Sequence, residues 1–130
     1  MAKRKELKSL GFPADGAGND PRNILRLLDR RSASPHPDET RIADYLRKAQ
    51  PYIVSPGATF DVLDGSGPIG SGTILTDGEW AWPDDLAHYL ETYHIDLPAP
   101  FLEAIVAAGF VPPSLTVQQM RGITLPDMGA

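Results

Sequence analysis

One predicted helix face carries the side chains best suited to chemistry. Asp84, His88 and Glu91 follow one another at spacings of four and three residues, which places them on one strip of a helix, with Asp85 alongside. Two carboxylates and an imidazole could bind a divalent metal or serve as general acid and base. A metal site normally takes a further ligand from a distant element, and the sequence indicates none. The favoured interpretation is therefore a solvated polar face.

Two tryptophans form the second chemical candidate. Trp80 and Trp82 lie two residues apart in a predicted strand, so both project from the same face. They could form a platform that stacks on a ligand, or an anchor at a protein interface. Together with Tyr89 and Tyr93 they could instead form the core between sheet and helix. We favour the core for Trp82 and keep Trp80, which is nearer the turn, as a candidate anchor.

Other sequence patterns associated with catalysis lack the residues that their chemistry needs. The glycine-rich stretch 65–72 lacks the lysine of a phosphate-binding loop, and it leads into a strand rather than a helix. No serine occupies a nucleophile-elbow pattern. The absence of cysteine excludes a disulfide, a thiolate metal site and a cysteine nucleophile. We therefore expect no enzyme, no cofactor and no metal.

Helices must position the polar strip and the aromatic residues. Asp20-Pro21 has the N-cap and first-turn residue types of a helix start, and apolar residues then recur on one side. Gly109 is a typical residue just after a helix end. The helices expected from such signals run from Asp20 through Arg31, from Pro37 through Ala49, from Pro83 through Tyr93, and from Phe101 through Ala108.

Strands are predicted between the second and third of these helices. Thr73–Thr76 and Glu79–Trp82 flank Asp77-Gly78, a pair typical of a hairpin with a type I′ turn. Two further strand candidates precede this hairpin: the short run Tyr52–Val54 and the alternating run Thr59–Asp64.

These elements predict a single α+β domain for the 130-residue chain. It has N-terminal helices, a small antiparallel sheet of three or four strands with the Asp-Gly hairpin, and C-terminal helices packed on the sheet. We divide the chain into a flexible basic arm (1–19), the domain (20–113) and a C-terminal extension (114–130). The basic opening lacks the apolar run of a signal peptide, and no stretch approaches the roughly 18 apolar residues of a membrane span. We expect a soluble cytoplasmic protein.

Charge is divided unevenly along the chain, whose net charge is −5. Eleven of the 12 Lys and Arg residues occur by Lys48 and the last is Arg121, so 72 consecutive residues contain no cation, while nine acids fall among them. Either the basic N-terminal helices fold over this stretch, or an acidic face remains in solvent. Such a face would repel nucleic acid and membranes, which we do not expect as partners, and would attract a basic protein.

Several motifs of the chain occur together in a known group of proteins. They are Asp61-Val62-Leu63-Asp64, the hairpin and helix from Thr76 to Leu90, the helix Asp38–Leu46, and the set Tyr89, Tyr93, His94, Leu97 and Pro98. On these motifs, residues 37–113 resemble a family of small bacterial, mainly actinobacterial, proteins. Several members look like immunity proteins of polymorphic toxin systems. The resemblance therefore implies a protein that binds and blocks a toxin rather than a catalyst.

From the charge and the resemblance we expect a non-catalytic immunity-type inhibitor that binds a cognate basic toxin through an acidic surface. The candidate contact residues are Asp77, Glu79, Trp80, Asp84, Asp85, His88 and Glu91. Two alternatives stay open. One is a small-molecule-binding protein or enzyme that uses His88 with Asp84 and Glu91. The other is a cytoplasmic adaptor that binds another protein.

Overall fold

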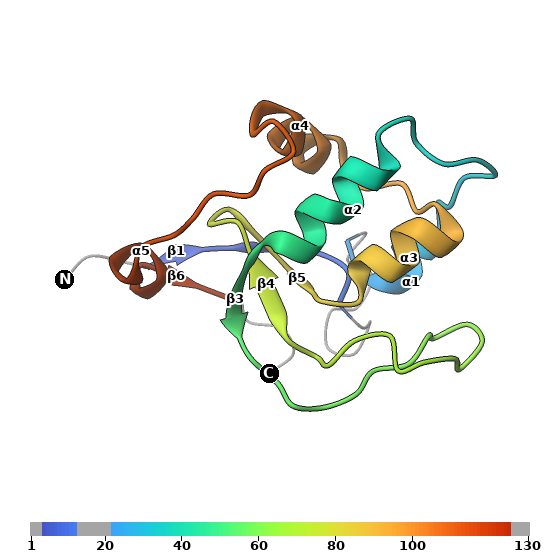
Figure 1. Ribbon diagram of the computed structural model, residues 1–130, viewed down its shortest axis with the longest axis horizontal. Helices are drawn as coiled ribbons and strands as arrows, with labels where there is room; N and C mark the ends of the chain where they lie inside the picture. Colours follow the sequence, from blue (N-terminus) through green and yellow to red (C-terminus); the bar gives the residue numbers. More distant parts are fainter. Residues whose placement is uncertain (1–3, 13–21, 126–130) are drawn as a thin grey trace.

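The computed structural model describes residues 4–12 and 22–125 of the chain (Figure 1). The fold is α+β, as predicted. The helices are α1 (Ile24–Asp29), α2 (Glu39–Lys48), α3 (Leu86–Tyr93), α4 (Ala99–Ala107) and α5 (Val117–Arg121). The strands are β1 (Lys5–Glu6), β2 (Lys8–Ser9), β3 (Gln50–Ile53), β4 (Ile74–Thr76), β5 (Trp80–Pro83) and β6 (Ile123–Thr124). Over the described ranges, no helix is both long and apolar enough to cross a membrane.

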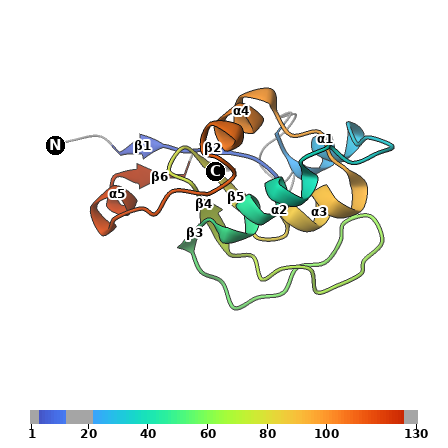
Figure 2. The same ribbon diagram turned by 45° about the horizontal axis from the view of Figure 1, so that its top comes forward.

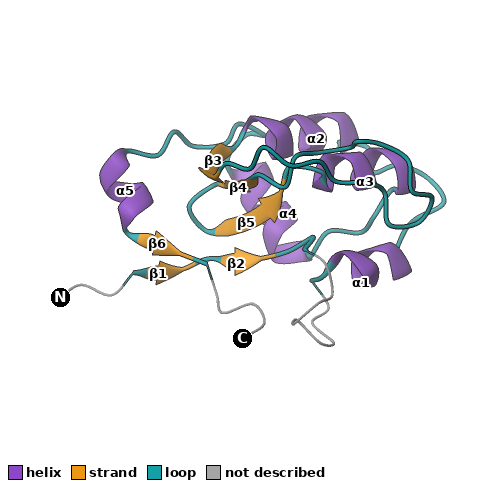
Figure 3. Ribbon diagram, turned by 90° about the horizontal axis from the view of Figure 1, so that it is seen from below, coloured by secondary structure: helices purple, strands orange, loops and turns teal. Residues whose placement is uncertain are grey.

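Four strands form the main sheet, in the order β2-β5-β4-β3 (Figure 3). The three strands β3, β4 and β5 are antiparallel neighbours, whereas β2 runs parallel to β5. The prediction of a purely antiparallel sheet is therefore wrong at one edge. The long chain between β2 and β5 contains α1 and α2, and a connection of this length allows two strands to pair in parallel.

Residues 4–12 are part of the fold, so the predicted flexible basic arm is wrong for them. Leu7 and Leu10 are buried, and the Leu10 amide donates to the Ala81 carbonyl oxygen at 3.0 Å. In extended chain, successive side chains point to opposite faces, so Lys8 stays exposed between buried neighbours. The many Lys and Arg residues of this segment make the alternation hard to recognise in the sequence. The remaining residues of the predicted arm, 1–3 and 13–19, lie outside the described residues.

The predicted C-terminal extension also packs onto the fold. Its strand β6 pairs in parallel with β1, with Lys5 opposite Ile123, and Figure 3 shows the two strands side by side. Ile123 is buried against Leu7. Helix α5, which precedes β6, begins with a capping box formed by Thr116 and Gln119. Residues 116–125 therefore complete the structure rather than extend from it.

The predicted hairpin forms, but its turn is not type I′. Strands β4 and β5 pair antiparallel, with Thr76 opposite Ala81. Gly78 has a φ of +93°, and Asp77 is not among the described residues with positive φ, although a type I′ turn needs positive φ at both central positions. The Asp77 carboxylate closes the turn instead, because its Oδ1 accepts from the Trp80 amide at 2.8 Å.

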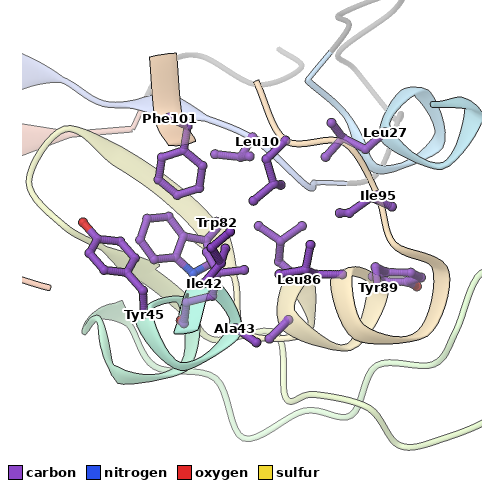
Figure 4. Close-up of a cluster of buried hydrophobic side chains, with 14 of the residues drawn as sticks. Leu10, Leu27, Ile42, Ala43, Tyr45, Trp82, Leu86, Tyr89, Ile95 and Phe101 are labelled. Atoms are coloured by element: carbon purple, nitrogen blue, oxygen red, sulfur yellow. Dashed lines mark hydrogen bonds between the residues drawn. The ribbon is translucent and has the colours of Figure 1, made fainter. Parts of the chain in front are cut away.

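Trp82 lies at the centre of the main core (Figure 4). Its side chain is 0% exposed, and its indole Nε1 donates to the Leu46 carbonyl oxygen at 3.0 Å. Tyr45 of α2 stacks on the indole at a centroid distance of 6.2 Å, and Phe101 of α4 meets it at 5.2 Å. The predicted core position of Trp82 is therefore confirmed. This one side chain joins the hairpin to α2 and α4.

The starts of α1 and α3 differ most from the prediction. Helix α1 begins at Ile24, with the Asn23 side chain as its N-cap. The predicted start at Asp20-Pro21 lies outside the described residues. Helix α3 begins at Leu86 because Pro83 still belongs to β5. Helices α2 and α3 lie side by side, so α3 presents its other face to the chain that connects β3 with β4 (Figure 1).

Candidate functional site

Residues 54–72, named here the 54–72 loop, leave the sheet after β3, pass beside α3 and return to β4 (Figure 2). The only strand pairing among these described residues is an isolated bridge between Thr59 and Gly70. The predicted strand Thr59–Asp64 is therefore wrong. Its apolar residues alternate as in a strand, but Asp61 opens a tight turn in which the Gly65 amide donates to the Asp61 carbonyl oxygen at 2.8 Å.

Asp61 fastens the 54–72 loop to α3. Its side chain is fully buried, and its Oδ2 lies 2.8 Å from His88 Nε2 and accepts from the Tyr93 hydroxyl at 2.8 Å. Its Oδ1 accepts from the Leu63 amide at 2.8 Å. Burial raises the pKa of Asp61, but these hydrogen bonds, first that of His88, outweigh burial and hold the pKa at about 2. The hydrogen bond from the Tyr93 hydroxyl to Asp61 raises the pKa of Tyr93 to about 12.

Two further residues hold the 54–72 loop in place. The Tyr89 hydroxyl accepts from the Val62 amide at 3.0 Å, and burial raises the pKa of Tyr89. Asp84, just before α3, accepts from the Ser71 hydroxyl at 2.7 Å and from the Ser71 amide at 3.0 Å. The loop is therefore fixed to α3 at its middle, through Asp61 and Val62, and to Asp84 near its return to β4, through Ser71.

The polar strip predicted on α3 does not form one site. Asp84 and His88 both bind the 54–72 loop. Glu91 instead forms an ion pair with Arg47 of α2, which lowers the pKa of Glu91. Across the ranges that the structure describes, no cluster of three His, Cys, Asp or Glu residues could hold a metal ion. The geometry for acid-base chemistry by His88 with Asp84 and Glu91 is absent, because each carboxylate faces a different partner.

Three of the seven predicted contact residues lie in the interior. Asp77 is buried, and its Oδ2 accepts from the Tyr45 hydroxyl at 2.7 Å, which raises the pKa of Tyr45 beyond the rise caused by burial. Trp80 is buried against Phe101, with ring centroids 5.0 Å apart. Asp85 is also buried. Their prediction as surface contacts is wrong, because the hairpin turn packs against α2 and α4, and because the 54–72 loop covers Asp85.

Cations from the N-terminal part of the chain neutralise acids of the cation-free stretch. Ion pairs join elements far apart in the sequence: Lys5 with Glu79, Arg47 with Glu91, and Arg30 with Asp96. Exposed pairs of this kind add little to stability, but their charges cancel locally. Of the two arrangements considered for the charge, the basic elements therefore fold over these acids. The predicted acidic surface loses both Glu79 and Glu91.

The loop that α3 fixes exposes large apolar side chains. Phe60, Val62 and Leu63 are 53%, 50% and 48% exposed. Leu25 of α1 is 46% exposed, and it lines a cavity of about 570 Å³ together with Leu63. These four residues are named here the α1–loop surface. Sequence analysis misses it because the alternation of Phe60 and Val62 predicts a strand with one buried face.

Lowering the pH should remove the stabilisation that Asp61 contributes. Its folded-state pKa of about 2 lies below its ordinary value of 3.8. The contribution is therefore complete above about pH 4 and is lost as the pH falls through about 2. The difference in free energy of unfolding between wild type and Asp61→Asn, measured by urea denaturation, should shrink from about pH 6 to about pH 3. A difference that stays constant over this range would contradict the ionised, buried carboxylate.

Comparisons with family models, with curated proteins and with solved structures found no match to this chain. Its function is therefore proposed from its own residues and from the resemblance that its motifs suggest. The residue that sequence analysis misses is Asp61, because its contact with His88 spans 27 positions of the chain. A usable signal was present in the run from Asp61 to Gly65, which is typical of a turn closed by an Asp side chain.

Proposed function

We propose that this chain is a non-catalytic, immunity-type protein that binds and neutralises a toxin protein, and that it binds through the α1–loop surface. The observation that carries the proposal is the exposure of Phe60, Val62 and Leu63 on one short turn, with Leu25 nearby. Single exposed apolar residues are common on protein surfaces. Several on one face favour a protein interface.

The attachment of the loop also supports binding. Asp61 and Tyr89 fix the backbone from which the apolar side chains project. A surface fixed before binding loses less conformational freedom when a partner arrives, which favours affinity. The His88 Nε2 atom lies 2.8 Å from Asp61 Oδ2 and helps to hold this carboxylate in place.

This surface takes the place of the acidic one in the sequence-based hypothesis. Glu79 and Glu91 are paired with cations, while Asp77 and Asp85 are buried. The expected partner therefore offers an apolar cleft rather than a basic face. A few anchor side chains that fill pockets of the partner supply most of the binding energy of many interfaces, and Phe60 is the largest apolar side chain available here for that role.

The test removes the apolar side chains from the loop. In the double variant Phe60→Ser/Leu63→Ser, we expect affinity for the partner to fall by about 100-fold or more, since two central apolar anchors typically contribute that much. Wild-type protein should capture one partner from its native cells and, when co-expressed, should restore growth to cells that the partner alone poisons. The double variant should fail in both measurements.

A matched control distinguishes the surface from general hydrophobicity. Val111, just beyond α4, is 67% exposed, and Val111→Ser should retain capture and growth rescue. Equal capture by the double variant and wild type would contradict the α1–loop surface. A captured partner that is harmless when expressed alone would contradict the immunity function and favour the adaptor alternative. Thermal unfolding of each variant verifies that it is folded.

A further inference from the structure

A second cavity, of about 470 Å³, lies on the inner side of the 54–72 loop. Its wall is mostly apolar and is formed by residues of α1, the loop, β4 and α3: Ile24, Phe60, Val62, Ile74 and Tyr89, with Phe12. The volume lies in the range of small-molecule sites, roughly 300–1,000 Å³. Since Phe60 and Val62 are about half exposed, the cavity reaches solvent beside them.

One carboxyl group, that of Asp85, lines this apolar cavity. Asp85 is only 9% exposed, and it occupies the N-cap position of α3 without making a side-chain capping hydrogen bond. Its backbone has helical φ and ψ angles, whereas a capping residue usually has an extended backbone. The carboxyl group therefore does not cap the helix that it precedes.

Within residues 4–12 and 22–125, no Lys or Arg side chain balances the charge of Asp85. Among the residues that the structure describes, none forms a salt bridge with Asp85. Burial raises the pKa of Asp85, and the neighbouring Asp84 carboxylate adds to the rise, while the Thr59 hydroxyl and His88 oppose it. A buried carboxylate of this kind would be stabilised by a cation that enters the cavity.

A second polar group lies beside the carboxyl group. Thr59 Oγ1 is buried and, although close to Asp85, has no hydrogen-bond partner of normal geometry in the described structure. Both residues crowd around Gly70. A Cβ atom there would lie 2.5 Å from Asp84 Oδ1, 2.9 Å from Thr59 Oγ1 and 3.0 Å from Asp85 Cβ. The glycine lets the two polar side chains approach one another at the cavity wall.

We propose that this cavity binds a small apolar molecule that carries one protonated amine. The ammonium group donates hydrogen bonds to the Asp85 carboxylate and to Thr59 Oγ1, and the apolar body lies against Phe60, Ile74 and Tyr89. The cavity supplies the apolar contact area, and the polar pair selects a cation over a neutral or anionic ligand. This site shares the side chains of Phe60 and Val62 with the α1–loop surface, whereas Leu25 and Leu63 line the other cavity. The ligand titration that tests this site uses no partner protein, so its outcome does not depend on the proposed function.

The test compares tryptamine with 3-ethylindole, which has a similar apolar body but no amine. Titration of the wild-type protein, followed by backbone amide NMR shifts, should move the signals of Gly72 and Ile74 with tryptamine. The affinity for tryptamine should exceed that for 3-ethylindole by about 10-fold or more, as expected for hydrogen bonds to a charged group. Because this comparison uses wild-type protein, it does not depend on a variant that folds.

The variant Asp85→Asn identifies the group that selects the amine. Since folding disfavours the charged form of Asp85, removal of the charge should leave the protein folded. Its affinity for tryptamine should fall about 10-fold, while its affinity for 3-ethylindole stays within about twofold of the wild-type value. The control Asp64→Asn, at an exposed position of the same loop, should change neither affinity.

Three outcomes would overturn the proposal. The first is that neither probe shifts amides around the cavity, which would show that the cavity accepts no ligand of this class. The second is equal affinity for tryptamine and 3-ethylindole, which would show apolar binding without selection of the amine. The third is an amine preference that survives in Asp85→Asn, which would place the selecting group elsewhere.

Discussion

Replacement of Trp82 with alanine should lower the free energy of unfolding by about 4 kcal/mol, the middle of the range for a fully buried large aromatic side chain. The indole fills the space between Tyr45 and Phe101, so its loss leaves a cavity between the hairpin, α2 and α4 (Figure 4). It also removes the donor to the Leu46 carbonyl oxygen. Since small domains are stable by only about 5–15 kcal/mol, the variant should unfold at much lower urea concentration.

Two control variants define what this measurement shows. Trp82→Phe keeps part of the volume but not the Nε1 donor, so its loss of stability should lie between those of wild type and Trp82→Ala. Val111→Ala, at an exposed position, should change the free energy of unfolding by less than about 0.5 kcal/mol. A loss of less than about 1 kcal/mol for Trp82→Ala would show that the core does not depend on this side chain.

Replacement of Asp61 with alanine should cost about 3 kcal/mol of stability and release the 54–72 loop. The change removes the acceptor shared by His88, Tyr93 and the Leu63 amide. Hydrogen exchange should report the release directly, with the Val62 and Leu63 amides losing protection while amides of β4 and β5 keep theirs. The same variant should weaken partner capture, because the apolar side chains are no longer fixed before binding.

Asp64 offers the matched control for Asp61. It lies three residues further along the same turn, is exposed, and its Oδ1 accepts from the Ser66 amide at 2.8 Å. Asp64→Ala should cost less than about 1 kcal/mol and should leave the protection of the Val62 amide unchanged. If the two variants behaved alike, the buried Asp61 cluster would not be what holds the loop.

The predicted helices and hairpin were accessible from sequence because their signals are local. Helix α2 shows an apolar stripe with buried Ile42 and Leu46, and α4 is followed by Gly109 at a φ of +64°. The core position of Trp82 follows from its place in a short strand between a turn and a helix. In each case the deciding residues lie within a few positions of one another.

The candidate site was much less accessible. The polar strip on α3 was visible, but its partners were not, because Asp61 lies 27 residues from His88 and 32 residues from Tyr93. Thr59–Asp64 has the alternation of a strand, and only the turn at Asp61 shows that Phe60 and Val62 face solvent. Whether the acids predicted as contacts remain unpaired at the surface depends on which cations approach them in space, and the sequence does not show this.

By itself, the sequence determined the α+β class, the helices from local periodicity and capping, and the hairpin around Asp77-Gly78. Only the tertiary structure decided that residues 4–12 add strands in parallel and that α3 turns polar side chains to the 54–72 loop. It also decided that basic residues pair with three acids of the cation-free stretch, Glu79, Glu91 and Asp96. The physical reason is the separation along the chain over which each kind of interaction acts. Propensity and periodicity act between neighbours in the chain, whereas hydrogen bonds, ion pairs and burial depend on which distant segments the folded backbone brings together.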